Sequence, residues 1–465
     1  MQIAAARLAA AAAFFAALLA PPPGGATATT TADAIDNAAR QARSRFGIPG
    51  MSVAVLLGGR LVYAKGFGLA DVTSQAPADA HTVYPFGSIA KQFTAAGVLA
   101  LAEAGRLGLA DPVARHVPEY WPHGNAATLE HLLRHTSGVR EFFSVPEAAA
   151  LIEDPRGTID DVMAIVARQP VVFPTGSRWS YSNSGYHLAA RVIEKRTGQP
   201  YETFLGAAFF EPLQLPSLHH CKPAPQPPRD ATGYARRRGA ITAAPWENMN
   251  TARGDGGLCG DAVDLARWTR QLARGEVLPA ALFAQMTRPT ITADGAAMPY
   301  GMGLALLPLD GRPRVSHSGA IGGFSAAAAS YPNEDLAIAV LTNLAFVPAE
   351  AIERDIARAM LGLPAPRWRD LPAPADLRAR VVGRWEVGLP GFVIEVVEAN
   401  GRLRVRMPLP GWSGELRYQG DGRFVSATAP DVHYLQLAAA GSDGAMVIGM
   451  GGLHWDARRL AGGGK

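Results

Sequence analysis

The chain has 465 residues, of which 48% are hydrophobic, and a formal net charge of +4. It is longer than a typical single domain and can build a substantial core, so we expect a folded protein of two domains. The Lys and Arg residues are scattered and form no dense basic block with interleaved aromatics, which argues against a nucleic-acid partner.

Residues 1–28 have the layout of a cleavable secretory signal. Arg7 precedes an apolar run over 8–20, and an Ala-x-Ala follows at 26–28. The run is about 13 residues long whereas a membrane span needs about 20, so cleavage near Thr29 is favoured over a membrane anchor. We therefore expect a periplasmic or secreted protein with no stable membrane span after cleavage.

The next segments predict a helix followed by an antiparallel pair of strands. ADAIDNAARQARSRF has apolar residues at helical spacing and stops at Gly47. MSVAVLL and LVYAKGFG are apolar runs joined by Gly58 and Gly59, which indicates a hairpin. Residues 89–105 are Ala-rich and predict a buried helix, and residues 107–290 mix helical segments with Pro and Gly loops.

Strand-like runs return near residue 300. YGMGLALLPL, RVSHSGA, FSAAAASYP and LAIAVLTN are short runs separated by turn residues, and PAEAIERDIARAMLGL then predicts a helix. Strands and helices occur near residues 33–71 and again near 300–362, with a helical insert between them. This order favours one antiparallel sheet that combines the strands of both segments. The expected class is α/β, an antiparallel sheet flanked by helices plus a mostly α subdomain.

The last part of the chain predicts a separate all-β module. Residues 364–376 are rich in Pro and are typical of a semi-rigid linker. Residues 377–465 contain short alternating runs separated by Asn-Gly, Gly-Asp-Gly and Ser-Asp-Gly turns, which favour a small barrel.

Ser88 and Lys91 are the first candidate catalytic pair. A serine hydroxyl is a poor nucleophile at neutral pH and needs a base within hydrogen-bond reach. Three residues apart on a helix, the two side chains share one face. An ordinary helix cap and a surface lysine would give the same Ser-x-x-Lys. However, the surrounding segment is almost free of charge until Glu103, so Lys91 is expected to be partly buried with a lowered pKa.

Tyr181 and Asn183, in WSYSNSGYH, form the second candidate group. A phenol near a lysine ammonium can lose its proton more easily and act as a base, and an Asn amide can hold both a lysine and a substrate carbonyl. The triplet is weak by itself, because Tyr-x-Asn also occurs at 331–333 in an expected turn.

His317, Gly319 and Ala320, in VSHSGAIGGF, form the third group. A strand edge with small residues allows a substrate backbone to pair with it. The Ala320 N–H could complete an oxyanion hole that also uses the N–H of Ser88.

In this order the three groups resemble the serine β-lactamase and penicillin-binding protein superfamily. The closest likeness is to its class C-like branch of D-alanyl-D-alanine carboxypeptidases, D-aminopeptidases and esterases. The resemblance extends over about residues 33–362 and includes the blocks GRLGLADPVARHVPEY, TLEHLLRHTSGV, YSNSGYHLAARVIEKRTG and GDGGLCGDAVDLARW. It implies a hydrolase domain over residues 29–363.

The resemblance also implies the role of each residue. Ser88 would be the acylated nucleophile, Lys91 its proton partner and Tyr181 the general base, the choice between the last two remaining open. Asn183 would orient Lys91 and the substrate amide. His317, Gly319 and Ala320 would bind the substrate, with no metal and no organic cofactor.

His317 is a departure from the family pattern, because many β-lactamases carry Lys at this position. Lys supplies a permanent charge for a substrate carboxylate, whereas His is largely neutral at pH 7. The departure favours the peptidase or esterase branch over an efficient β-lactamase. The first expected substrate class is peptides or amides that contain D-amino acids, including peptidoglycan fragments, followed by small esters and then β-lactams. The C-terminal module resembles the lipocalin-like domain of some D-amino-acid peptidases. A non-catalytic protein that binds cell-wall fragments is the alternative from another class.

Cys221 and Cys259 are the two cysteines of the chain. In an oxidising compartment they could form one disulfide, although Cys259 could equally be a buried free thiol. Two cysteines make no metal framework, and the sequence has no H-E-x-x-H pattern. The oligomeric state and the contribution of the β module to the site remain open.

Overall fold

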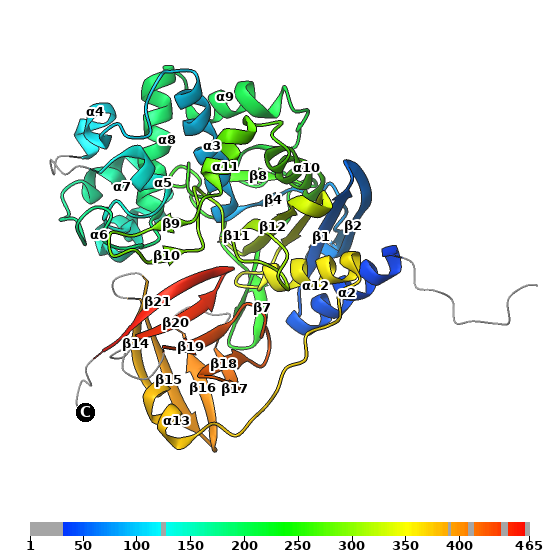
Figure 1. Cartoon of the computed structure of the whole chain (residues 1–465). Helices are drawn as coiled ribbons and strands as arrows, with labels where there is room; N and C mark the ends of the chain where they lie inside the picture. Colours follow the sequence, from blue (N-terminus) through cyan, green and yellow to red (C-terminus); the bar gives the residue numbers. More distant parts are fainter. Residues whose placement is uncertain (1–30, 122–126, 389–391, 408–412, 439–444, 461–465) are drawn as a thin grey trace, which may run out of the picture.

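The computed structural model describes residues 31–121, 127–388, 392–407, 413–438 and 445–460. The signal predicted over residues 1–28 lies outside them. Figure 1 shows two units, a sheet covered by helices and a β-barrel formed by the last part of the chain. The predicted fold class, an antiparallel α/β unit followed by a small barrel, is confirmed.

The central sheet joins both ends of the α/β unit. Its strand order is β11-β12-β13-β1-β2-β3, and β1 pairs antiparallel with β13, with Val53 opposite Val340. The predicted hairpin turns at Gly58 and Gly59, which both have positive φ angles. Strand β11 lies at one edge of this sheet. The strands are β1 (Gly50–Leu57), β2 (Arg60–Asp71), β3 (Ala76–Pro77), β11 (Val315–Ile321), β12 (Phe324–Tyr331) and β13 (Leu336–Thr342).

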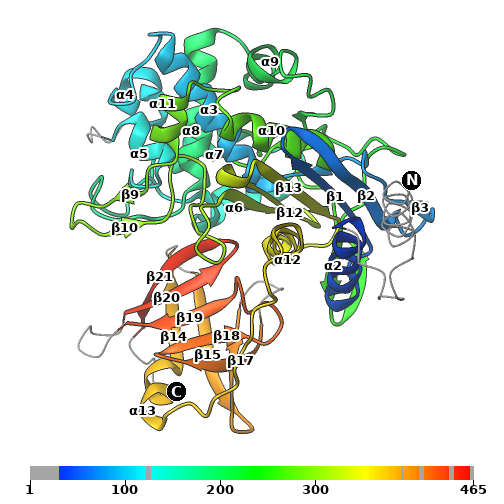
Figure 2. The same cartoon turned by 45° about the vertical axis from the view of Figure 1, so that its right-hand side comes forward.

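Successive residues of β1 face opposite helical layers, as the period of a strand requires. Val53 and Val55 are buried with α2 (Thr31–Phe46) and α12 (Ala349–Leu361), whereas Ala54 belongs to the core that contains α10 (Ala262–Ala273). Figure 2 shows α2 and α12 on one side of the strands and α10 on the other.

The mostly α subdomain lies between β3 and β11 in sequence. Its helices α3 and α8 pack in one core with α10. The elements are α3 (Ala90–Glu103), α4 (Val113–His116), α5 (Leu129–Leu133), α6 (Pro146–Glu153), α7 (Ile159–Val166), α8 (Asn183–Thr197), α9 (Tyr201–Leu205) and α11 (Ala280–Met286), with the short strands β4 (Tyr84–Pro85), β5 (His219–His220), β6 (Tyr234–Arg237), β7 (Ala240–Ala243), β8 (Leu258–Gly260), β9 (Thr290–Ile291) and β10 (Ala297–Met298).

The strand expected in YGMGLALLPL is wrong. Only isolated bridges occur there, such as Tyr300 with Ala305 and Ala305 with Ser316. The chain instead runs against the start of α3, where Gly303 has a φ of +71° and a Cβ on it would lie 2.7 Å from the Lys91 carbonyl oxygen. Gly permits this conformation and close approach, and the segment forms a loop beside Lys91.

The C-terminal unit is a closed barrel of eight antiparallel strands, preceded by α13 (Ala375–Val381). Alternate residues such as Val396, Val405 and Ile448 fill its interior. Its strands are β14 (Gly383–Val387), β15 (Val393–Ala399), β16 (Arg402–Arg406), β17 (Gly414–Gly420), β18 (Arg423–Ser426), β19 (Tyr434–Leu437), β20 (Ala445–Met450) and β21 (Leu453–Arg459).

A disulfide joins Cys221 to Cys259, across a sequence separation of 38. It ties the end of β5 to β8, which also pairs with β4 just before Ser88. In the described part of the chain, no helix is long and apolar enough to cross a membrane.

Candidate active site

Ser88 lies in the 3-10 turn η1 (Gly87–Ile89), between β4 and α3. Gly87 has a φ of +55°, and a Cβ on it would lie 2.8 Å from the Ala320 nitrogen. A Cβ on Gly319 would lie 1.9 Å from the Phe86 carbonyl oxygen and 2.9 Å from the Ser88 nitrogen. Gly at these two positions therefore lets β11 approach the turn, which brings the segments that contain the Ser88 and Ala320 nitrogens close together. The oxyanion hole formed by these two N–H groups stays a prediction.

Lys91 is completely buried on the first turn of α3. Its Nζ donates to Ser88 Oγ at 3.1 Å, to Asn183 Oδ1 at 2.7 Å and to the Asp255 carbonyl oxygen at 2.8 Å. Burial lowers the pKa of Lys91, although the nearby carboxylates of Asp255 and Glu141 oppose that shift. A lysine that loses its proton more easily beside a serine hydroxyl is suited to accept the proton of that hydroxyl.

Tyr181 lies beside Ser88, whose hydroxyl favours a lower pKa of the phenol. The Lys91 Nζ lies 4.7 Å from the centre of the Tyr181 ring. We expected this ammonium to ease ionisation of the phenol, but burial raises the pKa of Tyr181 well above its ordinary value of 10.0. The resting phenol is therefore protonated, and Tyr181 is better placed to pass on a proton than to remove the first one.

Glu141 fixes the orientation of Asn183. The backbone N–H of Asn183 donates to Glu141 Oε2 at 2.5 Å, and its Nδ2 donates to Oε1 at 3.0 Å. With its amino group held this way, Asn183 must present Oδ1 to Lys91. Burial raises the pKa of Glu141, and the charge of Lys91 opposes that shift. The lysine and the carboxyl therefore titrate as a linked pair.

His317 is buried on β11 and belongs to a chain of neutral hydrogen bonds. Burial, and then the charge of Lys91, lower its pKa to about 3. Its Nδ1 lies 2.5 Å from the Ser318 carbonyl oxygen, which can only accept, so Nδ1 carries the proton. Its Nε2 then accepts from the Tyr300 hydroxyl at 3.0 Å. His317 is therefore neutral and adds no positive charge to the site.

His135 continues the chain beyond Tyr300. The Ser182 N–H donates to His135 Nδ1 at 3.0 Å, so Nε2 carries the proton and donates to the Tyr300 oxygen at 3.3 Å. Burial holds the pKa of His135 well below its ordinary value. Its ring centre lies 4.4 Å from that of Tyr181. The chain therefore supports the face of Tyr181 with uncharged groups.

Two cavities flank Ser88, and both also contact Asn183 and Ala320. The larger, of about 310 Å³, is lined by Tyr181, the residues of β11 and the barrel. The smaller, of about 70 Å³, lies on the side of Phe142, Asp255 and Ile321. Ser88 lines both cavities, which together form a groove along β11 at the edge of the central sheet.

The barrel forms one wall of the larger cavity, which answers the question that the sequence left open. The turn between β20 and β21 reaches β11, where Ser318 Oγ donates to the Gly451 carbonyl oxygen at 2.5 Å. The Trp455 ring centre lies 5.6 Å from that of Tyr181 and 5.7 Å from that of Trp179. The barrel core and the site therefore share one buried aromatic cluster.

The structure brings together the seven residues predicted from the sequence. Among the residues that contact them, Glu141, Asp255 and Tyr300 were not predicted. Glu141 precedes two Phe residues, and Tyr300 lies in the segment that was expected to be a strand. Neither residue belongs to a local sequence pattern that indicates a catalytic site. Asp255 lies in GDGGLCGD, where the density of Gly beside an acid indicated a tight loop but not its partner. Within the described ranges, no group of three or more His, Cys, Asp or Glu could hold a metal ion.

Comparison with known proteins gives one matching family and three similar proteins. A family model described as Beta-lactamase matches residues 35–362. A D-aminopeptidase of Gluconobacter oxydans (strain 621H) is 28% identical over 376 residues, 80% of this chain and 70% of that protein. A D-stereospecific amidohydrolase from Streptomyces sp. aligns with a TM-score of 0.62 and 25% identity over 71% of this chain and 99% of that one. An octameric penicillin-binding protein homologue from Pyrococcus abyssi, 24% identical, aligns with a TM-score of 0.67 over 91% of this chain and 99% of that one, which shows likeness of fold.

Proposed function

Because the chain belongs to the Beta-lactamase family and is a serine hydrolase, we propose that it cleaves peptides or amides that contain D-amino acids through an acyl-enzyme on Ser88. The observation that carries the proposal is the 3.1 Å contact between Ser88 Oγ and the buried Lys91 Nζ, which gives the hydroxyl a proton acceptor. The similarity to the D-aminopeptidase and to the D-stereospecific amidohydrolase supports the substrate class.

Acylation begins when Ser88 Oγ attacks the substrate carbonyl carbon and Lys91, in its neutral form, takes the hydroxyl proton. The N–H groups of Ser88 and Ala320 donate to the oxyanion. Tyr181 gives its proton to the departing nitrogen, the C–N bond breaks, and Lys91 returns a proton to the phenol. Water then attacks the carbonyl carbon of the acyl-enzyme ester. Lys91 and Tyr181 accept the proton of the water and pass it to Ser88 Oγ, the C–O bond to Ser88 breaks, and the acid product leaves.

The larger cavity supports an amide or peptide substrate over a β-lactam or a carboxypeptidase substrate. Both of those carry a carboxylate near the bond that breaks. Among its described lining residues none is Lys or Arg, and burial lowers the pKa of His317 and of His433 to about 3. Glu350 adds a buried carboxyl whose Oε1 has no hydrogen-bond partner among the described residues. A substrate carboxylate would meet no positive charge there.

We place the working protein in the periplasm or outside the cell. The apolar run over 8–20 with its Ala-x-Ala supports export. The disulfide between Cys221 and Cys259 supports it independently, because such bonds persist mainly in oxidising compartments.

A panel of four substrates tests the proposed function. We expect D-alanine p-nitroanilide to be cleaved with a higher kcat/KM than L-alanine p-nitroanilide, p-nitrophenyl acetate and nitrocefin. The enantiomeric pair is the matched control, because its members differ only in handedness. Equal rates for the two enantiomers, or nitrocefin as the best substrate, would contradict the proposal.

Glu141→Gln tests the positioning of Asn183 and Lys91. Gln replaces one of the two acceptor oxygens with a donor, so one buried hydrogen bond is lost, and we expect kcat/KM to fall about 10- to 100-fold. The carboxylate also raises the pKa of Lys91. Its removal should therefore lower that pKa, and the limb of the pH–rate profile on which activity rises should move to lower pH.

Ser184→Ala is the matched control for that variant. Ser184 Oγ accepts from the backbone N–H of Phe142, the residue after Glu141, so the substitution loosens the same loop without changing a charge. It should lower the melting temperature and leave the pH limb in place. A pH limb that stays fixed in Glu141→Gln would show that Glu141 acts on the fold alone.

A further inference from the structure

The proton donor identifies which half of the groove holds the leaving group. Tyr181 must reach the departing nitrogen within hydrogen-bond distance to protonate it. Tyr181 lines the larger cavity and is absent from the described lining of the smaller one. On the proposed mechanism, the leaving group therefore occupies the larger cavity and the acyl group the smaller one.

The smaller cavity limits the size of that acyl group. Its volume of about 70 Å³ is less than a quarter of the 310 Å³ on the leaving-group side. Apolar side chains make one part of its lining: Phe142, Phe143, Ile152 and Ile321. This part suits the side chain of a single residue, whereas a longer acyl chain would have no room to continue.

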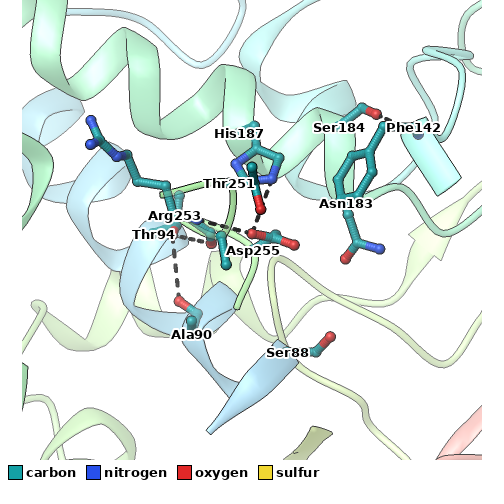
Figure 3. A network of polar contacts seen from close by, with 12 residues as sticks. Ser88, Ala90, Thr94, Phe142, Asn183, Ser184, His187, Thr251, Arg253 and Asp255 are labelled. Carbon is teal, nitrogen blue, oxygen red and sulfur yellow. Dashed lines mark hydrogen bonds and ion pairs between the residues drawn. The ribbon is translucent and has the colours of Figure 1, made fainter. Parts of the chain in front are cut away.

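Asp255 supplies a fixed carboxylate in the same cavity. The residue is 8% exposed, its Oδ1 accepts from the Arg253 N–H at 3.3 Å, and His187 Nε2 lies 3.2 Å from Oδ1. Burial lowers the pKa of His187 to about 4, so the imidazole brings no charge. Figure 3 shows the second oxygen of Asp255 directed to the side of Asn183.

Glu247 is the second carboxyl of this cavity. Burial, and then the charge of Asp255, raise the pKa of Glu247 to about 6. The two carboxyl groups therefore repel each other when both are ionised. Among the described residues that line the cavity, none is Lys, Arg or His. Lys91 is close to Asp255, but its Nζ donates to Ser88, Asn183 and the backbone carbonyl oxygen of Asp255. A cationic group in the cavity would relieve the repulsion between the two acids.

We propose that the smaller cavity seats one amino-terminal residue of the substrate and that Glu247 and Asp255 bind its free α-ammonium. The inference rests on the proposed function and narrows it. The α-ammonium is one carbon from the carbonyl that Ser88 attacks, so its binding groups must line the same cavity as Ser88, and both acids do. The protein would remove single residues from a free amino terminus or hydrolyse amino-acid amides, and would cleave substrates with a blocked amino group more slowly.

The test compares D-alanine p-nitroanilide with N-acetyl-D-alanine p-nitroanilide in the full chain. We expect the native protein to prefer the free amine. Glu247→Gln should lower kcat/KM for the free amine about 10- to 100-fold and leave the acetylated substrate unchanged, because it removes one charged hydrogen bond to the ammonium. Glu103→Gln, an exposed acid at the far end of α3, is the matched control and should change neither rate.

Labelling of Ser88 by an uncharged fluorophosphonate separates the possible failures. Glu247→Gln should be labelled at the native rate, which reports an intact site without an amine. Equal cleavage of both substrates by the native protein, or an equal loss of both in Glu247→Gln with native labelling, overturns the inference alone. An unlabelled Ser88 with no turnover of either substrate overturns the proposed function.

Discussion

Ser88→Ala is expected to reduce kcat/KM for D-alanine p-nitroanilide by at least about 10⁴-fold. The reason is that Ala leaves no oxygen to carry the acyl group, and a water molecule at this position would have to attack without the preorganised nucleophile. Ser88 is only partly exposed at the junction of η1 and α3, and its side chain caps no helix, so the fold should be unaffected.

Mass spectrometry checks the same substitution directly. The native chain incubated with a fluorophosphonate should gain one adduct on the peptide that contains Ser88, and Ser88→Ala should gain none. The disulfide-bonded fold, followed by its melting temperature, should be the same in both proteins. Turnover that persists in a folded Ser88→Ala would rule out an acyl-enzyme on this residue and with it the mechanism.

Local patterns were enough to predict the parts of the site that share one element. Ser88 and Lys91 lie one helical turn apart, so their spacing alone places the hydroxyl and the amine on one face. The Gly-Gly hairpin could be predicted for a similar reason, because it depends only on two neighbouring apolar runs and the turn between them.

Contacts between distant segments could not be predicted in this way. Glu141 reaches Asn183 across 42 residues, and Ser318 reaches Gly451 across 133. The strand expected near residue 300 does not form, because Gly303 has a positive φ and lets the chain pass against Lys91. This is a tertiary contact, and the pattern of hydrophobic residues gives no sign of it. His317 lines the larger cavity, but its partner Tyr300, which donates to its Nε2, comes from that same misread segment and could not be predicted.

Lys91→Met should lower kcat/KM by about 10³-fold, the middle of the range for a lost general base. Met keeps the length and the apolar character of the chain but has no amine to accept the Ser88 proton. Lys65→Met is the matched control, because that lysine lies on β2, far from the groove, with a partly exposed side chain paired to Asp36. It should leave the rate unchanged.

The pH dependence of kcat/KM decides whether Lys91 or Tyr181 is that base. A base must be deprotonated, so activity should rise with pH as the base loses its proton. Burial lowers the pKa of Lys91 below its ordinary 10.5, whereas burial raises that of Tyr181 above 10.0. If Lys91 is the base, activity rises with pH around the lowered pKa of Lys91. The rise is then kept in Tyr181→Phe, at a reduced rate, and is lost in Lys91→Met. A rise that lies above pH 10.0 and disappears only in Tyr181→Phe would assign the first proton transfer to the phenol, in which case the lysine ammonium serves to stabilise the phenolate.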